Sequence, residues 1–225
     1  MLRSHRPAPR QVRTHMKFAL QHHKVIPSVA LLALSASAGC SGRPSRLAPP
    51  VIPDDAGQQA VAKYDASGDG AINGDELAKA PALKAAVKRI DANGDGNVTA
   101  EEINARVAVW KNSRVAITRV AVKVRRDGLP LAGATVKLVP DEFLGPAVKP
   151  AQAVTDASGT AHLKISDDPA ERGVNLGFYR VEVTRPDASG KETIPARYNT
   201  ATELGTEITR DDPNADRLAI DLTGK

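Results

Sequence analysis

Two stretches of the chain repeat apolar residues at the spacing of a helix. In each stretch they recur at i, i+4 and i+7: Leu83, Val87 and Ile90, then Ile103, Val107 and Trp110. Residues at these intervals share one helical face, so each stretch is predicted to be a helix with that face in a core. Pro81 stands at the start of the first, where proline is tolerated. The short segment 77–90 leaves room for two helices of one to two turns each.

From about Arg114 the apolar period changes to two. Successive segments alternate inward and outward positions: Val120, Val122, Val124; Ala134, Val136, Leu138; Tyr179, Val181, Val183; Leu218, Ile220, Leu222. Turn clusters at 127–133, 156–159 and 186–190 separate them. Six or seven short strands predict an antiparallel β-sandwich over residues 114–225. The predicted fold class is therefore α+β and multidomain, with a helical module at 55–112 before the sandwich.

The N-terminal segment has the pattern of an export signal. Residues 1–24 are basic and contain no acidic residue, and 25–38 are a mostly apolar run that ends in small residues. That run is too short to cross a bilayer, which takes about 20 residues. A basic head, a short apolar core and a small-residue end are typical of a secretory signal, predicted here as residues 1–39. Met16 is an alternative start.

Cys40 is the one cysteine of the chain and directly follows this signal. The segment 35–40 resembles a bacterial lipobox, although Ser37 stands where leucine is usual. The resemblance implies cleavage before Cys40, a lipid on that residue and a membrane anchor in the cell envelope. Ser41 in place of aspartate favours the outer membrane or cell surface. A simple signal peptide with a free Cys40 is the alternative. Residues 40–54 are rich in proline and predict an extended tether.

Two twelve-residue segments, 65–76 and 91–102, carry oxygen-bearing residues at alternating positions. Calcium takes six to eight oxygen ligands, and a loop that supplies them must turn sharply at its sixth residue, here Gly70 and Gly96. The seventh residue of each segment donates its backbone carbonyl. The candidate ligands are Asp65, Ser67, Asp69, Ala71, Asn73, Glu76, Asp91, Asn93, Asp95, Asn97, Thr99 and Glu102.

These segments resemble the loops of the EF-hand family, which implies two bound Ca²⁺ ions. The second fits the pattern at every fixed position, and the first departs by Ser67, which removes a charge and is expected to weaken that site. Ile72 and Val98, at the eighth positions, favour a short strand pairing between the loops. Tyr64 and Trp110 are expected to be core residues. Sensor EF-hands expose a methionine-rich groove, but both methionines precede Cys40, so a structural role for calcium is favoured over a switch.

Three segments of the C-terminal half, 128–140, 155–161 and 177–183, resemble the carboxypeptidase regulatory-like, transthyretin-like domain. The segments 140–145 and 194–199 look like a version of that domain found in bacterial envelope lipoproteins. The resemblance implies a non-catalytic accessory or adhesive module. It implies no peptidase activity, because the zinc-binding catalytic unit of carboxypeptidases is separate from this domain.

Charge and histidine content narrow the function classes. The formal charge is +5, but residues 40–225 hold 25 Lys/Arg against 26 Asp/Glu, so net charge does not indicate a nucleic-acid partner. Four of the five histidines precede Cys40, which excludes a multi-histidine metal centre from the rest. His162 alternates with Ala161 and Leu163 and is expected on the exposed strand face with Lys164. The chain is therefore predicted not to be an enzyme.

Three functions remain as hypotheses. The first is a lipid-anchored structural or protein-interaction component of the envelope, in which calcium stiffens the junction between modules and another envelope protein is a possible partner. The second is a dockerin-like module that binds a cohesin-like partner on the cell surface, although Glu76 and Glu102 occupy positions where dockerins tend to have aspartate. The third is a hydrolase, disfavoured by the histidine content and by carboxylates already assigned to calcium.

Overall fold

The computed structural model describes residues 47–213 and 217–224. The predicted signal peptide and the first seven residues of the predicted tether, 40–46, lie outside these residues, and Cys40 is the first of those seven. Within the described part, no helix has the length and apolar character that a membrane span requires.

Four helices form the N-terminal part of the described chain: α1 (Ala56–Tyr64), α2 (Gly74–Lys79), α3 (Pro81–Ile90) and α4 (Ala100–Ser113). Between them, β1 (Ala71–Ile72) and β2 (Val98–Thr99) pair antiparallel with Ile72 opposite Val98, which confirms the predicted pairing. The prediction of one to two turns is wrong for α3, which has ten residues. Ala80 is both the last cap of α2 and the first cap of α3. No connecting loop therefore separates α2 from α3, and α3 is about one turn longer than predicted.

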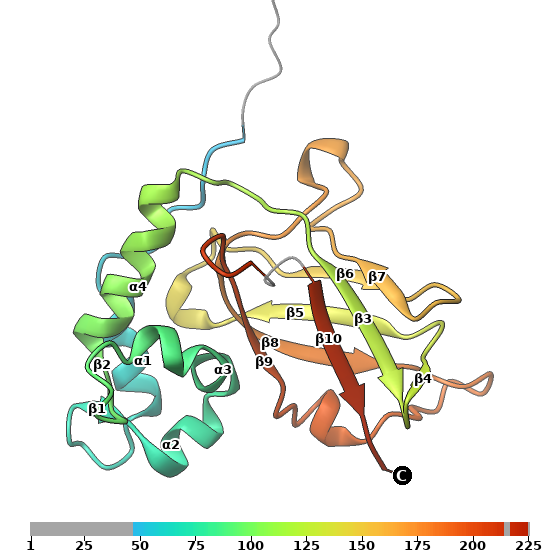
Figure 1. Ribbon diagram of the computed structural model, residues 1–225, viewed down its shortest axis with the longest axis horizontal. Helices are drawn as coiled ribbons and strands as arrows, with labels where there is room; N and C mark the ends of the chain where they lie inside the picture. Colours follow the sequence, from blue (N-terminus) through green and yellow to red (C-terminus); the bar gives the residue numbers. More distant parts are fainter. Residues whose placement is uncertain (1–46, 214–216, 225) are drawn as a thin grey trace, which may run out of the picture. The chain divides into compact units, whose positions relative to one another are not determined.

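Eight strands and three 3₁₀ turns form the C-terminal part of the described residues (Figure 1). The strands are β3 (Ala121–Arg126), β4 (Leu129–Pro130), β5 (Thr135–Pro140), β6 (Ala151–Val154), β7 (Thr160–His162), β8 (Gly177–Thr184), β9 (Gly205–Ile208) and β10 (Arg217–Leu222). The 3₁₀ turns are η1 (Glu142–Leu144), η2 (Pro169–Glu171) and η3 (Ala196–Tyr198). The α+β class is confirmed.

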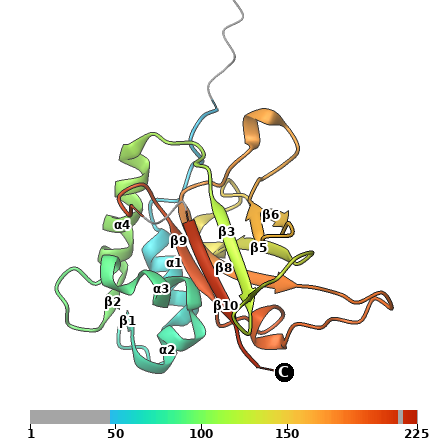
Figure 2. The same ribbon diagram turned by 45° about the vertical axis from the view of Figure 1, so that its right-hand side comes forward.

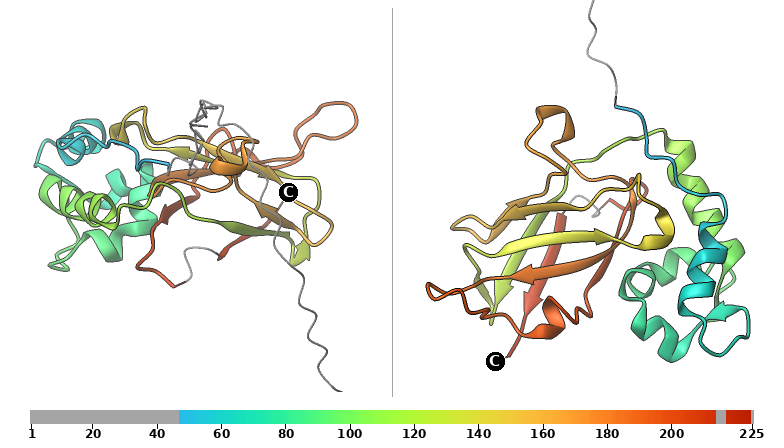
Figure 3. Two further views of the ribbon diagram at one scale, coloured as in Figure 1. Left: turned by 90° about the horizontal axis from the view of Figure 1, so that it is seen from above. Right: turned by 180° about the vertical axis from the view of Figure 1, so that it is seen from behind.

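The strands form two four-stranded sheets. One has the order β6-β5-β8-β9 and is antiparallel throughout, and in the other β3 pairs with β10, β4 and β7. Strands β3 and β10 cross in front of β5 and β8, and the view from above shows the sheets as two layers (Figures 2 and 3). The all-antiparallel expectation is wrong for one pair, because β10 runs parallel to β3 with Leu218 opposite Val122. Alternation predicts which residues face inward, but it does not determine strand direction.

The alternating residues face the core as predicted. Those of 120–124, 134–138 and 179–183 are at most 2% exposed, while Leu218 is half-buried. His162 is exposed between buried Ala161 and Leu163, which confirms its predicted orientation. The core consists mostly of Val, Leu, Ile and Ala, and it is continuous between the helical and β parts, which belong to one compact unit.

The helices pack closely on the β8–β9 edge and on one another, and one glycine permits each of these approaches. A Cβ on Gly205 of β9 would lie 1.9 Å from the Pro81 carbonyl oxygen at the start of α3. A Cβ on Gly57 of α1 would lie 2.0 Å from the Ala100 carbonyl oxygen at the start of α4. The Trp110 ring meets Phe178 edge-on, with centroids 4.6 Å apart, and fills the space between α4 and β8. Trp110 is therefore a core residue, as expected.

Candidate metal centre

The first loop begins where α1 ends. Asp65 caps α1 through its backbone N–H, which donates to the Val61 carbonyl at 2.9 Å. Its carboxylate faces into the loop and accepts from the N–H of Gly68 at 2.6 Å and of Gly70 at 2.9 Å. Both glycines have φ near +80°, a conformation that disfavours other side chains. The chain can therefore wrap tightly around the first predicted ligand.

Glu76 closes the same loop from the first turn of α2. One oxygen accepts from the N–H of Ala66 and Ser67, each at 2.9 Å, and the other accepts from the Asn73 N–H at 3.2 Å. This last contact belongs to a capping box, in which side chains at both ends of the first turn satisfy free N–H groups. The cap thus holds the twelfth-position carboxylate over the start of the loop.

Asp69 completes a cluster with these two residues. Its carboxylate accepts from the Ala71 N–H and from the Asn73 side-chain amide, each at 3.0 Å. One oxygen from each of Asp65, Asp69 and Glu76 lies within 4.8 Å of the others. Ligands that bind one Ca²⁺ at 2.3–2.6 Å are at most about 5 Å apart, so this spacing suits calcium.

Backbone donors favour the ionised form of Asp65 and Glu76. The Gly70 N–H, with help from Gly68, holds the pKa of Asp65 below its usual value, and the Ser67 N–H does the same for Glu76. Hydrogen bonds to the charged form lower a carboxyl pKa because they stabilise the anion. Three anionic groups so close together repel one another, and a divalent cation would remove that repulsion.

The second loop repeats the arrangement at its two ends. Asp91 accepts from the N–H of Gly94 at 2.7 Å and of Gly96 at 3.0 Å. Glu102 accepts from the N–H of Ala92 and Thr99 at 3.2 and 3.1 Å, and a capping box with Thr99 begins α4. Calcium coordination would therefore connect the end of α3 to the start of α4.

The middle of the second loop is more open. Asp95 and Asn93 bond each other, with Asn93 Nδ2 donating to Asp95 Oδ2 at 3.0 Å, and Asp95 also accepts from the Asn97 N–H. Among the described residues, only the first loop gathers three carboxylates within 4.8 Å. The sequence favours the second loop, whereas the geometry gathers ligands more tightly in the first.

The remaining predicted ligands lie at or between these groups. Ala71 is in β1 and Asn97 directly precedes β2, so the carbonyl-donating positions flank the strand pair that joins the loops. The Ser67 hydroxyl donates to Asp65 Oδ1 at 3.1 Å, which places it beside the first ligand despite its missing charge. The hydroxyl of Thr99 donates to Glu102 at 3.0 Å.

Two buried acids next to the calcium loops were missed by the sequence analysis. Asp141 and Glu207 come from the β part, and their side chains are fully buried. Glu207 accepts from Arg89, Arg106 and Trp110 at 2.6, 2.6 and 3.1 Å. The position of Arg106 in the sequence could have predicted such an acid. Arg106 lies on the apolar face of α4 between Ile103 and Trp110, and a buried cation requires an acidic partner.

An EF-hand family model matches residues 83–108, which span most of α3, the second loop and much of α4. This match supports the prediction that the second loop is an EF-hand and that the chain binds calcium. No curated protein and no solved structure matches the chain.

Proposed function

We propose that this protein is a non-enzymatic structural or interaction protein, in which two calcium ions hold a helical module against a β-sandwich. The observation that carries the proposal is the cluster of Asp65, Asp69 and Glu76, whose oxygens lie within 4.8 Å of one another. The second ion would occupy the loop that matches the EF-hand family. The oxygen donors of both loops fit a hard cation such as Ca²⁺.

The contacts that flank the first loop support a bracing role. Lys63 and Tyr64, the last residues before the loop, both reach the buried carboxylate of Asp141. Lys63 Nζ lies 3.1 Å from it, and the Tyr64 hydroxyl donates at 2.9 Å. Burial and the nearby Asp141 raise the pKa of Tyr64 to about 12, which keeps this hydroxyl a donor at neutral pH. The helix that enters the first loop therefore ends on the β part.

The second loop is flanked in the same way. Arg89 lies two residues before its first ligand, and Arg106 lies four residues after its last, and both bond Glu207 of β9. Glu207 is opposite Phe178 in the β8–β9 ladder, and the Phe178 carbonyl accepts from the Asp141 N–H at 3.0 Å. Both anchoring acids thus lie next to one strand residue, Phe178.

The expected effect of calcium on stability follows from this arrangement. Without the ion, repulsion among the ligand carboxylates loosens the loops and the helix ends that hold Asp141 and Glu207. Extracellular calcium sites bind at roughly 10⁻⁴–10⁻³ M, so about 1 mM calcium would add about 0.4–1.4 kcal/mol per site. The calcium concentration outside a cell would therefore be enough to occupy both sites and stabilise the contact between the helical module and the β part.

We further propose that the chain is exported and anchored by a lipid on Cys40 at the outer membrane or cell surface. The basic head, the short apolar run and the cysteine directly after it support this part of the proposal. The sequence resemblance to the carboxypeptidase regulatory-like, transthyretin-like domain supports an accessory role for the β part. Mass spectrometry of the protein from its host would show diacylglycerol on Cys40, and Cys40→Ser would abolish it.

Calcium titration of the full-length chain tests the central proposal. Calorimetry should show two bound ions and an increase in melting temperature, with one ion lost in Glu76→Gln and one in Glu102→Gln. Asp75→Asn and Glu101→Gln are matched controls, because each is the exposed neighbour of a twelfth-position ligand. Neither control should change the number of ions. If calcium produces no heat and no shift in melting temperature, the proposal is wrong.

A further inference from the structure

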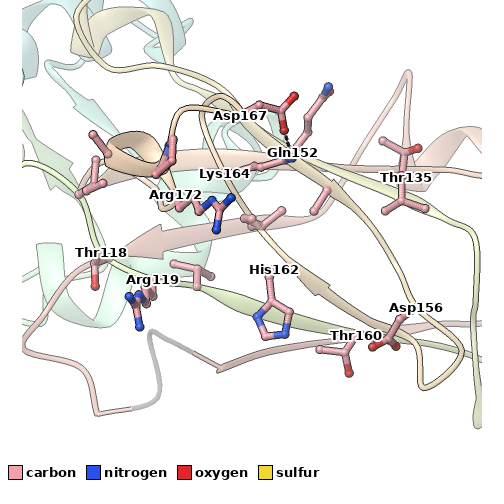
Figure 4. Close-up of a pocket in the computed structure, with 17 residues that line it drawn as sticks. Thr118, Arg119, Thr135, Gln152, Asp156, Thr160, His162, Lys164, Asp167 and Arg172 are labelled. Carbon is pink, nitrogen blue, oxygen red and sulfur yellow. Dashed lines mark hydrogen bonds and ion pairs between the residues drawn. The ribbon is translucent and has the colours of Figure 1, made fainter.

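A large pocket lies on the β part, away from the calcium loops. Its volume is about 1220 Å³, and it is lined by the segment that leads into β3, by β6 and β7, and by the η2 region (Figure 4). Pockets that bind small molecules are typically about 300–1,000 Å³, so this one has room for a ligand of disaccharide size.

Three cationic or hydrogen-donating side chains point into this pocket from separate parts of the chain. Arg119 precedes β3, His162 ends β7 and Arg172 follows η2, and Figure 4 shows them around the same part of the hollow. In the described parts of the chain, neither guanidinium group has a hydrogen bond or an ion pair within 4 Å. Two fork-shaped donors without a hydrogen-bond acceptor therefore face one space, a geometry that suits carboxylate or phosphate groups.

The acidic residues of the pocket offset only part of the positive charge of this cluster. Asp167 forms an ion pair with Lys164, which lowers the pKa of Asp167, and the charge of Arg172 lowers it further. Asp156 lies at the far end of the pocket, where it accepts from Ser158 and from the Thr160 N–H within its own turn (Figure 4). Once Lys164 and Asp167 cancel, the lining retains two arginines against one aspartate.

The remaining lining indicates how a ligand would be recognised. Thr118, Thr135 and Gln152 also line the pocket, and in the described structure these side chains have no hydrogen bond of their own. No Phe, Tyr or Trp lines the pocket, so it has no platform on which a sugar ring would stack. Recognition would therefore depend on charge and hydrogen bonds.

We propose that this pocket binds a small ligand that carries at least two oxyanion groups on a hydroxyl-bearing skeleton. Arg119 and Arg172 would each bind one carboxylate or phosphate group, and His162 would donate an N–H between them. The hydroxyl groups of the ligand would bond Thr118, Thr135 and Gln152. This site does not depend on the proposed calcium brace.

Titration followed by NMR tests the proposal on the full-length chain at saturating calcium. Digalacturonate supplies two carboxylates, glucose 1,6-bisphosphate supplies two phosphates, and maltose is the uncharged control. Each is added up to about 10 mM, beyond the roughly 1 mM range of weak binding. Amide signals of 117–120, 160–164 and 170–172 should shift with one or both anions but not with maltose. The anion that binds identifies the source of the charge, and signals of the calcium loops should not move.

Variants separate specific binding from general charge attraction. Arg119→Gln and Arg172→Gln should each weaken binding about tenfold, because each removes a charge-assisted pair. Arg125→Gln is the matched control, since Arg125 is an exposed arginine of β3 outside the pocket lining. Three results would overturn the proposal. Maltose could shift the same signals as the anions, or neither anion could shift the signals of the pocket. Arg125→Gln could also weaken anion binding as much as Arg119→Gln does.

Discussion

Arg106 Nε lies 2.6 Å from Glu207 Oε1, and this ion pair is buried between α4 and β9, with side chains 7% and 0% exposed. The other Glu207 oxygen lies 2.6 Å from Arg89 Nε of α3. One carboxylate thus binds both helices that flank the second calcium loop. Burying charges is costly, but removing one partner of such a pair is costlier, because the remaining partner loses a charge that compensated for its burial.

The first prediction concerns Glu207 itself. Glu207→Ala leaves the buried Trp110 N–H without an acceptor. It also leaves Arg106 with Asp211 and Arg89 with Asp212 as their remaining acidic partners. The free energy of unfolding should therefore fall by about 3 kcal/mol in urea denaturation. Glu203→Ala, an exposed acid of the preceding loop, should change it by less than about 0.5 kcal/mol. Equal effects of the two substitutions would show that the ion pair adds no stability.

The second prediction concerns the coupling between this acid and calcium. Glu207→Gln keeps the side-chain volume but removes the charge that orients α3 and α4. Calcium affinity of the second loop should fall by roughly fivefold, within the usual range of coupling between sites, while that of the first loop stays unchanged. Calorimetry in the Glu76→Gln background isolates the second loop. An unchanged affinity would mean that Glu207 supports the fold without affecting the ion.

The third prediction concerns pH and Asp211. The Arg106 guanidinium holds the pKa of Asp211 well below its usual value of 3.8. A depressed folded-state pKa gives stability that is complete above the unfolded value and lost as pH falls toward the folded one. Asp211→Asn should therefore destabilise the protein at pH 7 but much less near pH 2, as measured by urea denaturation across that range. A difference that stays constant with pH would contradict the assignment.

The fourth prediction concerns Gly205. Its substitution by alanine places a Cβ 1.9 Å from the Pro81 carbonyl oxygen, so α3 must move away from β9. We expect a loss of about 1–3 kcal/mol or more in unfolding free energy, together with weaker calcium binding. Gly190→Ala is a control for glycine loss alone, because it meets no atom within 4 Å although its φ is +84°. It should leave calcium binding unchanged.

The fifth prediction concerns Ser67, which lies where EF-hand loops usually have aspartate or asparagine. Ser67→Asp adds a carboxylate beside Asp65 and should tighten calcium binding to the first loop by roughly tenfold, since ligand charge tunes affinity in these loops. Ser158→Asp, in an exposed turn of the β part, is the control for added charge and should not change the calcium affinity of the first loop. Weaker binding after Ser67→Asp would show that the loop already holds its maximum charge.

The local sequence determined much of this protein. Alternation and helical spacing identified the inward-facing residues of the strands and helices, because burial of one face imposes a period on the side chains. Glycine and carboxylate spacing located both candidate calcium loops and their strand pair, because each loop is a short segment whose candidate ligands are positioned by its own backbone. Export and lipidation at Cys40 remain predictions from the same kind of local pattern.

Only the tertiary structure decided how these elements combine. Three of its contacts join residues far apart in the chain. They are the parallel pairing of β10 with β3, the close approach of Gly205 to Pro81, and the ion pairs of Glu207 with Arg89 and Arg106. The same is true of Arg119, His162 and Arg172 around one pocket. Such contacts leave no period in the sequence, because they depend on how whole elements pack once their apolar faces are buried.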